Sequence, residues 1–222
     1  MKILTSPSLF AADLLNVEKE VKRTEEAGAD TIHFDVMDGV YVPNISIGFE
    51  LLKAVRKVTD LPIDAHMMTV CPERYIHTLA EAGADIITVH NDIASTEAIL
   101  EMIEEIHNHG LMAAIALKPK VEAEAILPFI DHIDMVLVMT VEPGFSGQSF
   151  MDMSEKIRAI KGYIGDRSIS IQVDGGINAD TAAICAAAGA NVFVVGSAAY
   201  RSADMKATLD GVKASAEKAY NF

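Results

Sequence analysis

The stretch HFDVMDG, residues 33–39, places His33 and Asp35 two positions apart in a run that its β-branched character predicts to be a strand. Alternate residues of a strand point to the same face, so both side chains should leave the strand together. An imidazole and a carboxylate that converge can hold a divalent cation, and the carboxylate can also move protons. The pair therefore predicts a chemical site whose other members lie elsewhere in the chain.

Short β-branched runs alternate with longer amphipathic runs about eight times along the chain. The longer runs carry apolar residues at helical spacing, as at Leu51, Leu52, Val55 and Val58. Strands that alternate with helices of this length pair in parallel. The predicted strands cover residues 3–9, 31–36, 63–67, 86–90, 112–117, 135–139, 169–173 and 192–195.

A small-residue phrase recurs before three of these strands, as EAGAD twice and AAGAN once. Its glycines, Gly28, Gly83 and Gly189, lie where a helix needs a left-handed residue at its C-terminal end. Eight such units in 222 residues predict an α/β protein, a single-domain (β/α)8 TIM barrel over residues 1–222. An open doubly wound sheet is the alternative, but it usually carries a GxGxxG turn after its first strand, and SPSLFAAD has no glycine.

Composition limits the partners and compartments that we expect. Half of the residues are hydrophobic, so one large core is feasible, yet no apolar run approaches the roughly 20 residues of a membrane span. The net charge of −14 argues against nucleic acid and against an anionic membrane surface, although backbone amides could still bind a small anion. Two cysteines without paired spacing, and no signal-like N-terminus, predict a cytoplasmic protein.

Polar residues fall at or just beyond the ends of separate predicted strands, where the chemistry of a barrel gathers. Four of them have the character of metal ligands, and only a closed barrel would bring them together. Two imidazoles and two carboxylates suit zinc, iron(II), manganese or cobalt better than calcium or magnesium. The strand-end residues are Ser8, His33, Asp35, His66, His90, Thr140, Asp174 and Ser197, and the candidate ligands among them are His33, Asp35, His66 and Asp174.

Three glycine-bearing loops follow the last three predicted strands, and together they predict a phosphate-binding site. They read EPGFSGQSF, DGGIN and VGSAAY. Glycine lets backbone N–H groups approach an anion, and a helix that begins just beyond adds its positive end. Barrels often bind phosphate at the loops after strands seven and eight. The residues concerned are Gly144, Gly147, Gly175, Gly176, Gly196 and Ser197.

Three methionines, Met37, Met68 and Met139, occupy positions at the predicted mouth of the barrel. They could simply fill space in the core, which is the usual role of methionine. They could also form a soft, water-poor floor under a planar reaction intermediate. The sequence leaves both interpretations open.

The phrases SPSLFAADLLN, HFDVMDGVYVPNISIG, HMM, MTVEPGFSGQSF, VDGGIN and VGSA resemble those of the ribulose-phosphate 3-epimerase family, in the same order and over nearly the whole chain. The resemblance implies an isomerase of the pentose phosphate pathway that interconverts D-ribulose 5-phosphate and D-xylulose 5-phosphate. It implies one divalent metal, usually zinc or iron, and proton transfer at C3 by two aspartates through a metal-stabilised enediolate.

The resemblance also implies a role for each matched residue. His33, Asp35, His66 and Asp174 match the metal ligands, and Asp35 with Asp174 matches the acid/base pair. Ser8 and His66 match substrate contacts, and the phosphate site comprises Gly144, Phe145, Ser146, Gly147, Gly175, Gly176, Gly196 and Ser197. One departure is Ser146, because the family most often has glycine there, so the serine backbone must reach the same geometry without the freedom of glycine.

Three other functions share parts of this pattern. A 3-epimerase of a six-carbon ketose phosphate, such as D-allulose 6-phosphate, would carry nearly the same motifs. Related decarboxylases place a lysine two residues after the aspartate of strand two, where this chain has Met37. A non-catalytic phosphate-binding barrel would not require two aspartates with two histidines. The expected partner is a ketose phosphate, and a homo-oligomer is expected because barrels commonly associate.

Overall fold

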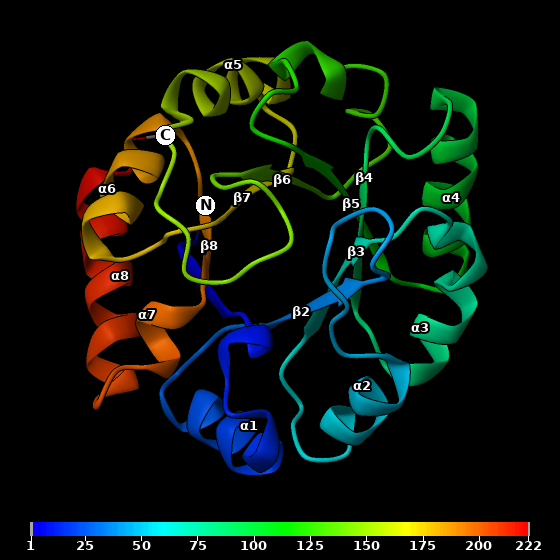
Figure 1. The fold of residues 1–222 in the computed structure, drawn as a ribbon. Helices are drawn as coiled ribbons and strands as arrows, with labels where there is room; N and C mark the ends of the chain where they lie inside the picture. The colour runs from blue at the N-terminus through cyan, green and yellow to red at the C-terminus, as the bar shows by residue number, and fades with distance from the viewer. Residues whose placement is uncertain (1, 222) are drawn as a thin grey trace.

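The computed structural model describes residues 2–221, and eight parallel strands form its centre (Figure 1). Four strands, β4, β5, β6 and β8, cover the predicted residues, and the other four differ by one or two residues at one or both ends. The strands are β1 (Leu4–Pro7), β2 (Ile32–Met37), β3 (Ile63–Met68), β4 (Ile86–His90), β5 (Met112–Leu117), β6 (Met135–Met139), β7 (Ser170–Asp174) and β8 (Val192–Val195).

The strand order β1-β8-β7-β6-β5-β4-β3-β2 leaves β1 and β2 to close the barrel. They meet through a single parallel bridge between Ser8 and His33, one residue beyond the end of β1. The backbone N–H of Ser8 also donates to the carbonyl of Val195, at 3.2 Å. Because Ser8 joins β8 to β2, the predicted (β/α)8 TIM barrel is confirmed. The chain then leaves the sheet in a 3₁₀ turn, Leu9–Ala11, which is why β1 ends earlier than predicted.

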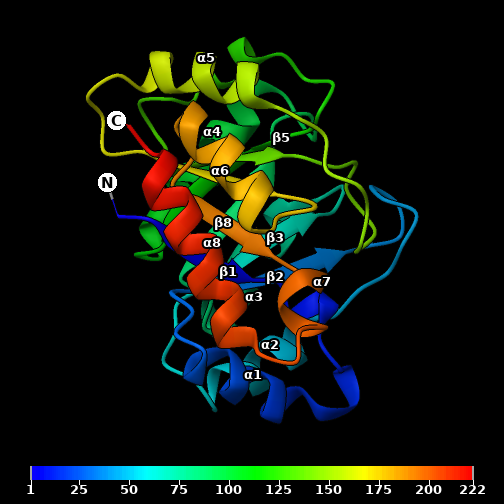
Figure 2. The ribbon, with the colours of Figure 1, turned by 90° about the vertical axis from the view of Figure 1, so that its left-hand side faces the viewer.

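Helices surround the strands on all sides (Figures 1 and 2). The segment between β5 and β6 differs from expectation, because it holds only a 3₁₀ turn, Ala123–Ile126, instead of an α-helix. Pro119 and Pro128 flank that segment, and a proline lacks the N–H that continues a helix. Within residues 2–221, no helix has the length and apolar character that a membrane span needs. The α-helices are α1 (Val17–Glu26), α2 (Phe49–Arg56), α3 (Ile76–Ala82), α4 (Thr96–Asn108), α5 (Ser154–Ile164), α6 (Ala179–Ala188), α7 (Ser197–Tyr200) and α8 (Met205–Ala219).

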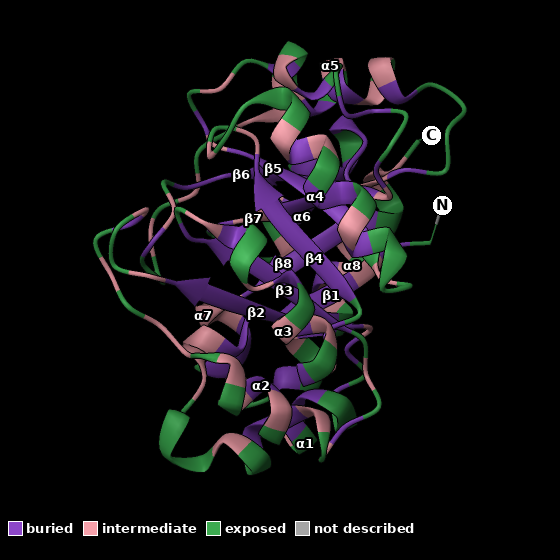
Figure 3. Cartoon of the chain, turned by 90° about the vertical axis from the view of Figure 1, so that its right-hand side faces the viewer, coloured by how far each residue is buried: buried purple, intermediate pink, exposed green. Residues whose placement is uncertain are grey.

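Burial follows the barrel closely, with the strands almost entirely inaccessible (Figure 3). Inside the barrel, an apolar cluster that includes Ile86, Met135 and Val192 fills the end where the strands begin. The opposite end carries buried polar side chains, including Asp35 and His66. The apolar cluster therefore stabilises one end of the barrel, while the mouth at the other end carries polar groups.

The recurring small-residue phrase has the predicted conformation. Gly28, Gly83 and Gly189 have φ values of +81°, +96° and +118°, in the region that favours glycine. At Gly83 and Gly189 the backbone N–H also closes the last turn of α3 and α6. These glycines let each helix stop and turn directly into the next strand.

Candidate active site

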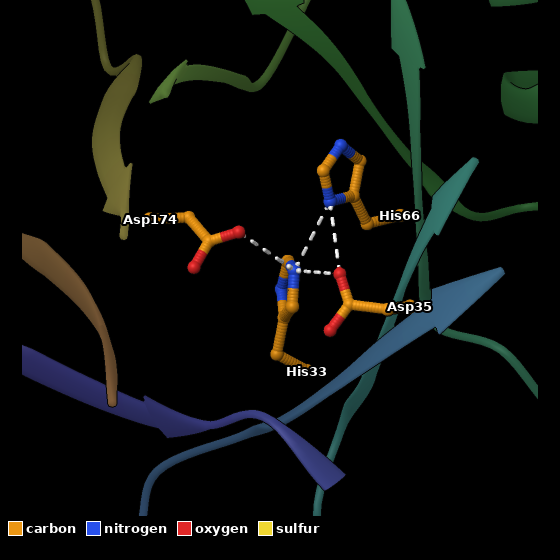
Figure 4. Close-up of side chains that lie close together, drawn as sticks. All are labelled: His33, Asp35, His66 and Asp174. Atoms are coloured by element: carbon orange, nitrogen blue, oxygen red, sulfur yellow. Dashed lines mark hydrogen bonds and ion pairs between the residues drawn. The ribbon is translucent and has the colours of Figure 1, made fainter. Parts of the chain in front are cut away.

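Four side chains from three strands meet at the mouth of the barrel (Figure 4). They are His33 and Asp35 from β2, His66 from β3 and Asp174 from β7, with one ligand atom of each within 4.8 Å of the others. Nε2 of His33 lies 3.3 Å from Oδ1 of Asp35, 3.3 Å from Nδ1 of His66 and 3.8 Å from Oδ2 of Asp174. The structure thus brings together the four candidate ligands, and this buried cluster could bind a divalent metal.

Asp64 orients His33 from below the cluster. Its Oδ2 lies 2.9 Å from Nδ1 of His33, and Thr88 Oγ1 and Gln172 Nε2 each donate to the same carboxylate at 2.9 Å. A carboxylate accepts hydrogen bonds, so His33 donates through Nδ1 and directs Nε2 toward the cluster. The sequence interpretation missed Asp64, although its position two residues before His66 on one strand places it on the same face.

Burial and neighbouring charges shift the pKa values of the clustered groups in different directions. Burial alone would lower the pKa of His33, but the carboxylates of Asp35 and Asp64 outweigh it and raise that pKa well above its usual value. Burial alone would raise the pKa of Asp35, but His33 and His66 hold it below its usual value. Burial raises the pKa of Asp174 to about 6 despite the opposing charge of His33. At neutral pH, an imidazolium therefore compensates the carboxylates.

The donor set fits a divalent transition metal. Two imidazole nitrogens and two carboxylate oxygens face one point, and the two negative charges match the charge of the ion. The imidazolium of His33 supplies positive charge at this point when the protein is metal-free. A bound cation would replace that charge, so the same carboxylates would remain compensated.

A cavity of 490 Å³ opens above Asp35 and Asp174. None of its described lining residues is a lysine or arginine, so an anion there would depend on backbone N–H groups and hydroxyls. His33 and His66 lie beneath it, fully buried, and do not line it. The predicted residues that do line it are Ser8, Asp35, Met37, Met68, Met139, Gly144, Phe145, Ser146, Gly147, Asp174, Gly175, Gly176, Gly196 and Ser197.

Ser8 holds Asp35 as well as lining the cavity. Its Oγ donates to Oδ2 of Asp35 at 2.6 Å, while Oδ1 of Asp35 faces the histidines. The two oxygens of Asp35 therefore have different environments. The expected contact between Ser8 and a substrate stays a prediction.

The loop after β6 accommodates Ser146 without strain. Gly144 and Gly147 have φ values of +120° and +79°, whereas no described residue other than glycine has a positive φ. Ser146 therefore does not need the freedom of glycine. Its Oγ would lie 4.0 Å from a Cβ placed on Gly196, so the hydroxyl faces the turn after β8.

The turn after β7 is packed directly against the loop after β6. A Cβ on Gly176 would lie 2.8 Å from the backbone nitrogen of Phe150, and one on Gly175 would lie 2.8 Å from that of Val141. The start of α6 contributes less than expected, because Asn178 accepts from the N–H groups of Asp180 and Thr181 in a capping box. An anion at this turn would therefore meet the glycine backbone instead of the helix end.

Replacing Gly176 with alanine should damage both stability and the cavity. A left-handed alanine costs about 1–2 kcal/mol and overpacking against Phe150 about 1–3 kcal/mol, so we expect a loss of about 2–5 kcal/mol in the free energy of unfolding. Urea denaturation measures this loss. Gly162→Ala in α5 is the matched control, because nothing lies within 4 Å of its added Cβ, and it should leave stability equal or higher. Equal stability of both variants would contradict the packing argument.

Comparisons with known proteins agree with this geometry. The profile of the Ribulose-phosphate 3 epimerase family matches residues 4–200. Ribulose-phosphate 3-epimerase from Bacillus subtilis is 42% identical over 217 residues, which cover 96% of this chain and 99% of the relative. The enzyme of the same name from Schizosaccharomyces pombe is 42% identical, covering 96% and 94%. Among solved structures, 3-hexulose-6-phosphate synthase from Salmonella typhimurium has a TM-score of 0.75, 19% identity and coverage of 98% and 100%, a likeness of fold alone.

Proposed function

The chain belongs to the ribulose-phosphate 3-epimerase family, and from this membership we propose that it interconverts D-ribulose 5-phosphate and D-xylulose 5-phosphate. The chain is an enzyme, an epimerase of carbohydrate metabolism. We further propose that Asp35 and Asp174 move the proton and that the bound metal is zinc or iron(II).

The observation that carries the proposal is the opposed placement of Asp35 and Asp174. They come from β2 and β7, and Figure 4 shows their carboxylates on opposite sides of His33. Both line the same cavity, so both can reach one bound sugar. Inversion at a carbon needs a proton removed from one face and returned to the other, and these two carboxylates supply both groups.

In the proposed reaction, one aspartate takes the proton from C3 and leaves an enediolate. The other aspartate then donates a proton to the opposite face of C3, and the reverse reaction exchanges their roles. The pKa shifts of Asp35 and Asp174 are opposite, so Asp174 takes up a proton more readily than Asp35 does. A divalent metal held by His33, Asp35, His66 and Asp174 would act as a Lewis acid that stabilises the developing negative charge.

The rest of the cavity fits a phosphorylated sugar. The glycine loops after β6, β7 and β8 would bind the phosphate through backbone N–H groups, with the hydroxyls of Ser146 and Ser197 beside them. Met37, Met68 and Met139 are nearly inaccessible and would cover the planar intermediate with apolar surface. Met37 also distinguishes the site from a decarboxylase, because no ammonium group is present at that position to protonate a carbanion.

The decisive experiment follows solvent deuterium into the sugar. The metal-loaded protein is incubated in D2O with ribulose 5-phosphate or with allulose 6-phosphate, with and without a chelator. We expect deuterium at C3 of both the substrate and its epimer, faster with the five-carbon sugar, and only without chelator. Faster exchange with the six-carbon sugar would transfer the proposal to that substrate. Chelator-insensitive exchange, or none at all, would contradict it.

A further inference from the structure

His90, the last residue of β4, lies fully buried behind the candidate metal cluster. Its ring meets that of His66 edge to edge, with centroids 5.0 Å apart and the ring planes inclined by 26°, and the ring of Tyr41 contacts it with centroids 4.9 Å apart. Nε2 of His90 is 2.9 Å from Nε2 of His66. Its Nδ1 is buried and has no hydrogen-bond partner among residues 2–221.

The geometry decides which nitrogen His66 can offer to a metal. Nδ1 of His66 faces the cluster, 3.2 Å from Oδ1 of Asp35 and 3.3 Å from Nε2 of His33. A neutral imidazole has one protonated and one unprotonated nitrogen, so ligation through Nδ1 requires the proton on Nε2. That N–H points at Nε2 of His90, which must then accept it.

The two ligand histidines therefore use opposite nitrogens. His33 directs Nε2 to the cluster because Asp64 accepts from its Nδ1, whereas His66 directs Nδ1 there and meets His90 through Nε2. A partner on the far nitrogen fixes both the tautomer and the ring orientation of a ligand histidine. His90 stands in the same relation to His66 as Asp64 does to His33.

This arrangement has a cost that packing alone does not explain. When Nε2 of His90 accepts, its proton lies on Nδ1, the atom without a partner. A buried N–H without an acceptor costs about 1–3 kcal/mol. A phenylalanine would fill similar space but would leave the buried Nε2 of His66 without its partner, so the imidazole does more than fill space.

Tyr41, which packs against His90, is itself held by Asp92 and Lys118. Tyr41 donates its hydroxyl to Oδ1 of Asp92 at 2.6 Å, and Nζ of Lys118 lies 3.0 Å from the other oxygen of Asp92. The same Nζ lies 3.9 Å from the centre of the Tyr41 ring, a cation–π contact. These contacts keep the Tyr41 ring packed against His90, which limits rotation of the His90 imidazole.

We propose that His90 is a positioning residue that accepts the Nε2–H of His66 and so keeps Nδ1 of His66 free to ligate the metal. The inference rests on the proposed metal site. In this role His90 fixes the tautomer of His66 and would not itself contact the ion, and it does not line the cavity.

The test compares His90→Phe, which keeps the ring and removes the acceptor, with His90→Gln, whose amide oxygen can still accept from His66. Zinc affinity is measured by competition with a chromogenic chelator, after thermal unfolding shows that each variant is folded. We expect a 10- to 100-fold weaker affinity for His90→Phe and a change below about threefold for His90→Gln. His109→Phe is the matched control, because His109 packs against His77 away from the site, with centroids 5.3 Å apart, and its affinity should not change.

A second measurement does not depend on the variants. Two-bond ¹H–¹⁵N NMR spectra of the zinc-loaded wild-type protein should show His66 ligated through Nδ1 and protonated on Nε2. Ligation through Nε2, or wild-type zinc affinity in His90→Phe, would overturn this inference and leave the proposed function standing. Failure of the wild-type protein to bind zinc, iron(II), manganese or cobalt would overturn both.

Discussion

Asp35→Asn and Asp174→Asn should each lower the turnover of ribulose 5-phosphate by roughly 10²–10⁴-fold, because each removes one of the two proposed proton-transfer groups. Asparagine keeps the size of the side chain but cannot take up or release the proton. The variants should remain folded, since Ser8 can still donate to an amide oxygen at position 35 and Asp174 lies at the rim of the cavity. Epimer formation at saturating metal measures the loss, and circular dichroism monitors the fold.

Deuterium exchange by the single variants distinguishes a two-base mechanism from a one-base mechanism. If each aspartate serves one face of C3, a single variant should still exchange deuterium into one of the two epimers without inverting it. The two variants should then show exchange with opposite sugars. Asp131→Asn, which removes a carboxylate paired with Arg167 on the surface, is the control and should keep full turnover. Near-normal epimerisation by either site variant would refute the two-base mechanism.

Periodicity and the glycine stops were sufficient to predict the barrel. Strands such as β4 and β6 have the predicted bounds because each is a short apolar run between turn residues, and both signals are local. The 3₁₀ turn at Ala123–Ile126 was missed because its apolar residues have helical spacing, while the short span between Pro119 and Pro128 limits helix growth. In this segment the short distance between the two prolines decided the structure, and the helical spacing of the apolar residues did not.

The site was predictable only where its residues share a strand or follow a strand end. His33 and Asp35 lie two residues apart, and His66 and Asp174 are positioned by closure of the barrel. The partners of the histidines depend on lateral register, which places Asp64 beside His33. Such a neighbour is determined by the register between two paired strands, and the sequence of neither strand specifies that register alone.

The same limit applies to the group around His90. Tyr41, Asp92 and Lys118 follow β2, β4 and β5, and nothing in their spacing indicates that they touch. Their contacts arise because the mouth of a barrel gathers the loops of separate strands. Local patterns therefore locate the candidate site residues, and three-dimensional closure supplies the residues that orient them.

Lowering the pH should weaken metal binding steeply, because protons and the metal compete for the same atoms. In the metal-free protein the raised pKa of His33 keeps a proton on the imidazole at neutral pH, and a metal must displace it. Below about pH 6 Asp174 takes up a second proton, since its pKa is raised to about 6, whereas the lowered pKa of Asp35 leaves that group ionised. Each bound proton costs up to about tenfold in apparent affinity per pH unit, so we expect a fall of roughly 10²–10³-fold between pH 7 and pH 5.

Calorimetric titration with zinc in buffers of different ionisation enthalpy counts the protons released. Because the pKa values of His33 and Asp174 are both raised, zinc should release about one proton near pH 7, from His33, and close to two near pH 5, where Asp174 also starts protonated. His107→Gln removes an exposed histidine paired with Asp134 and should release the same number as the wild type. An apparent affinity that stays constant from pH 7 to pH 5, with no proton released, would show that the imidazolium of His33 does not occupy the site before the metal does.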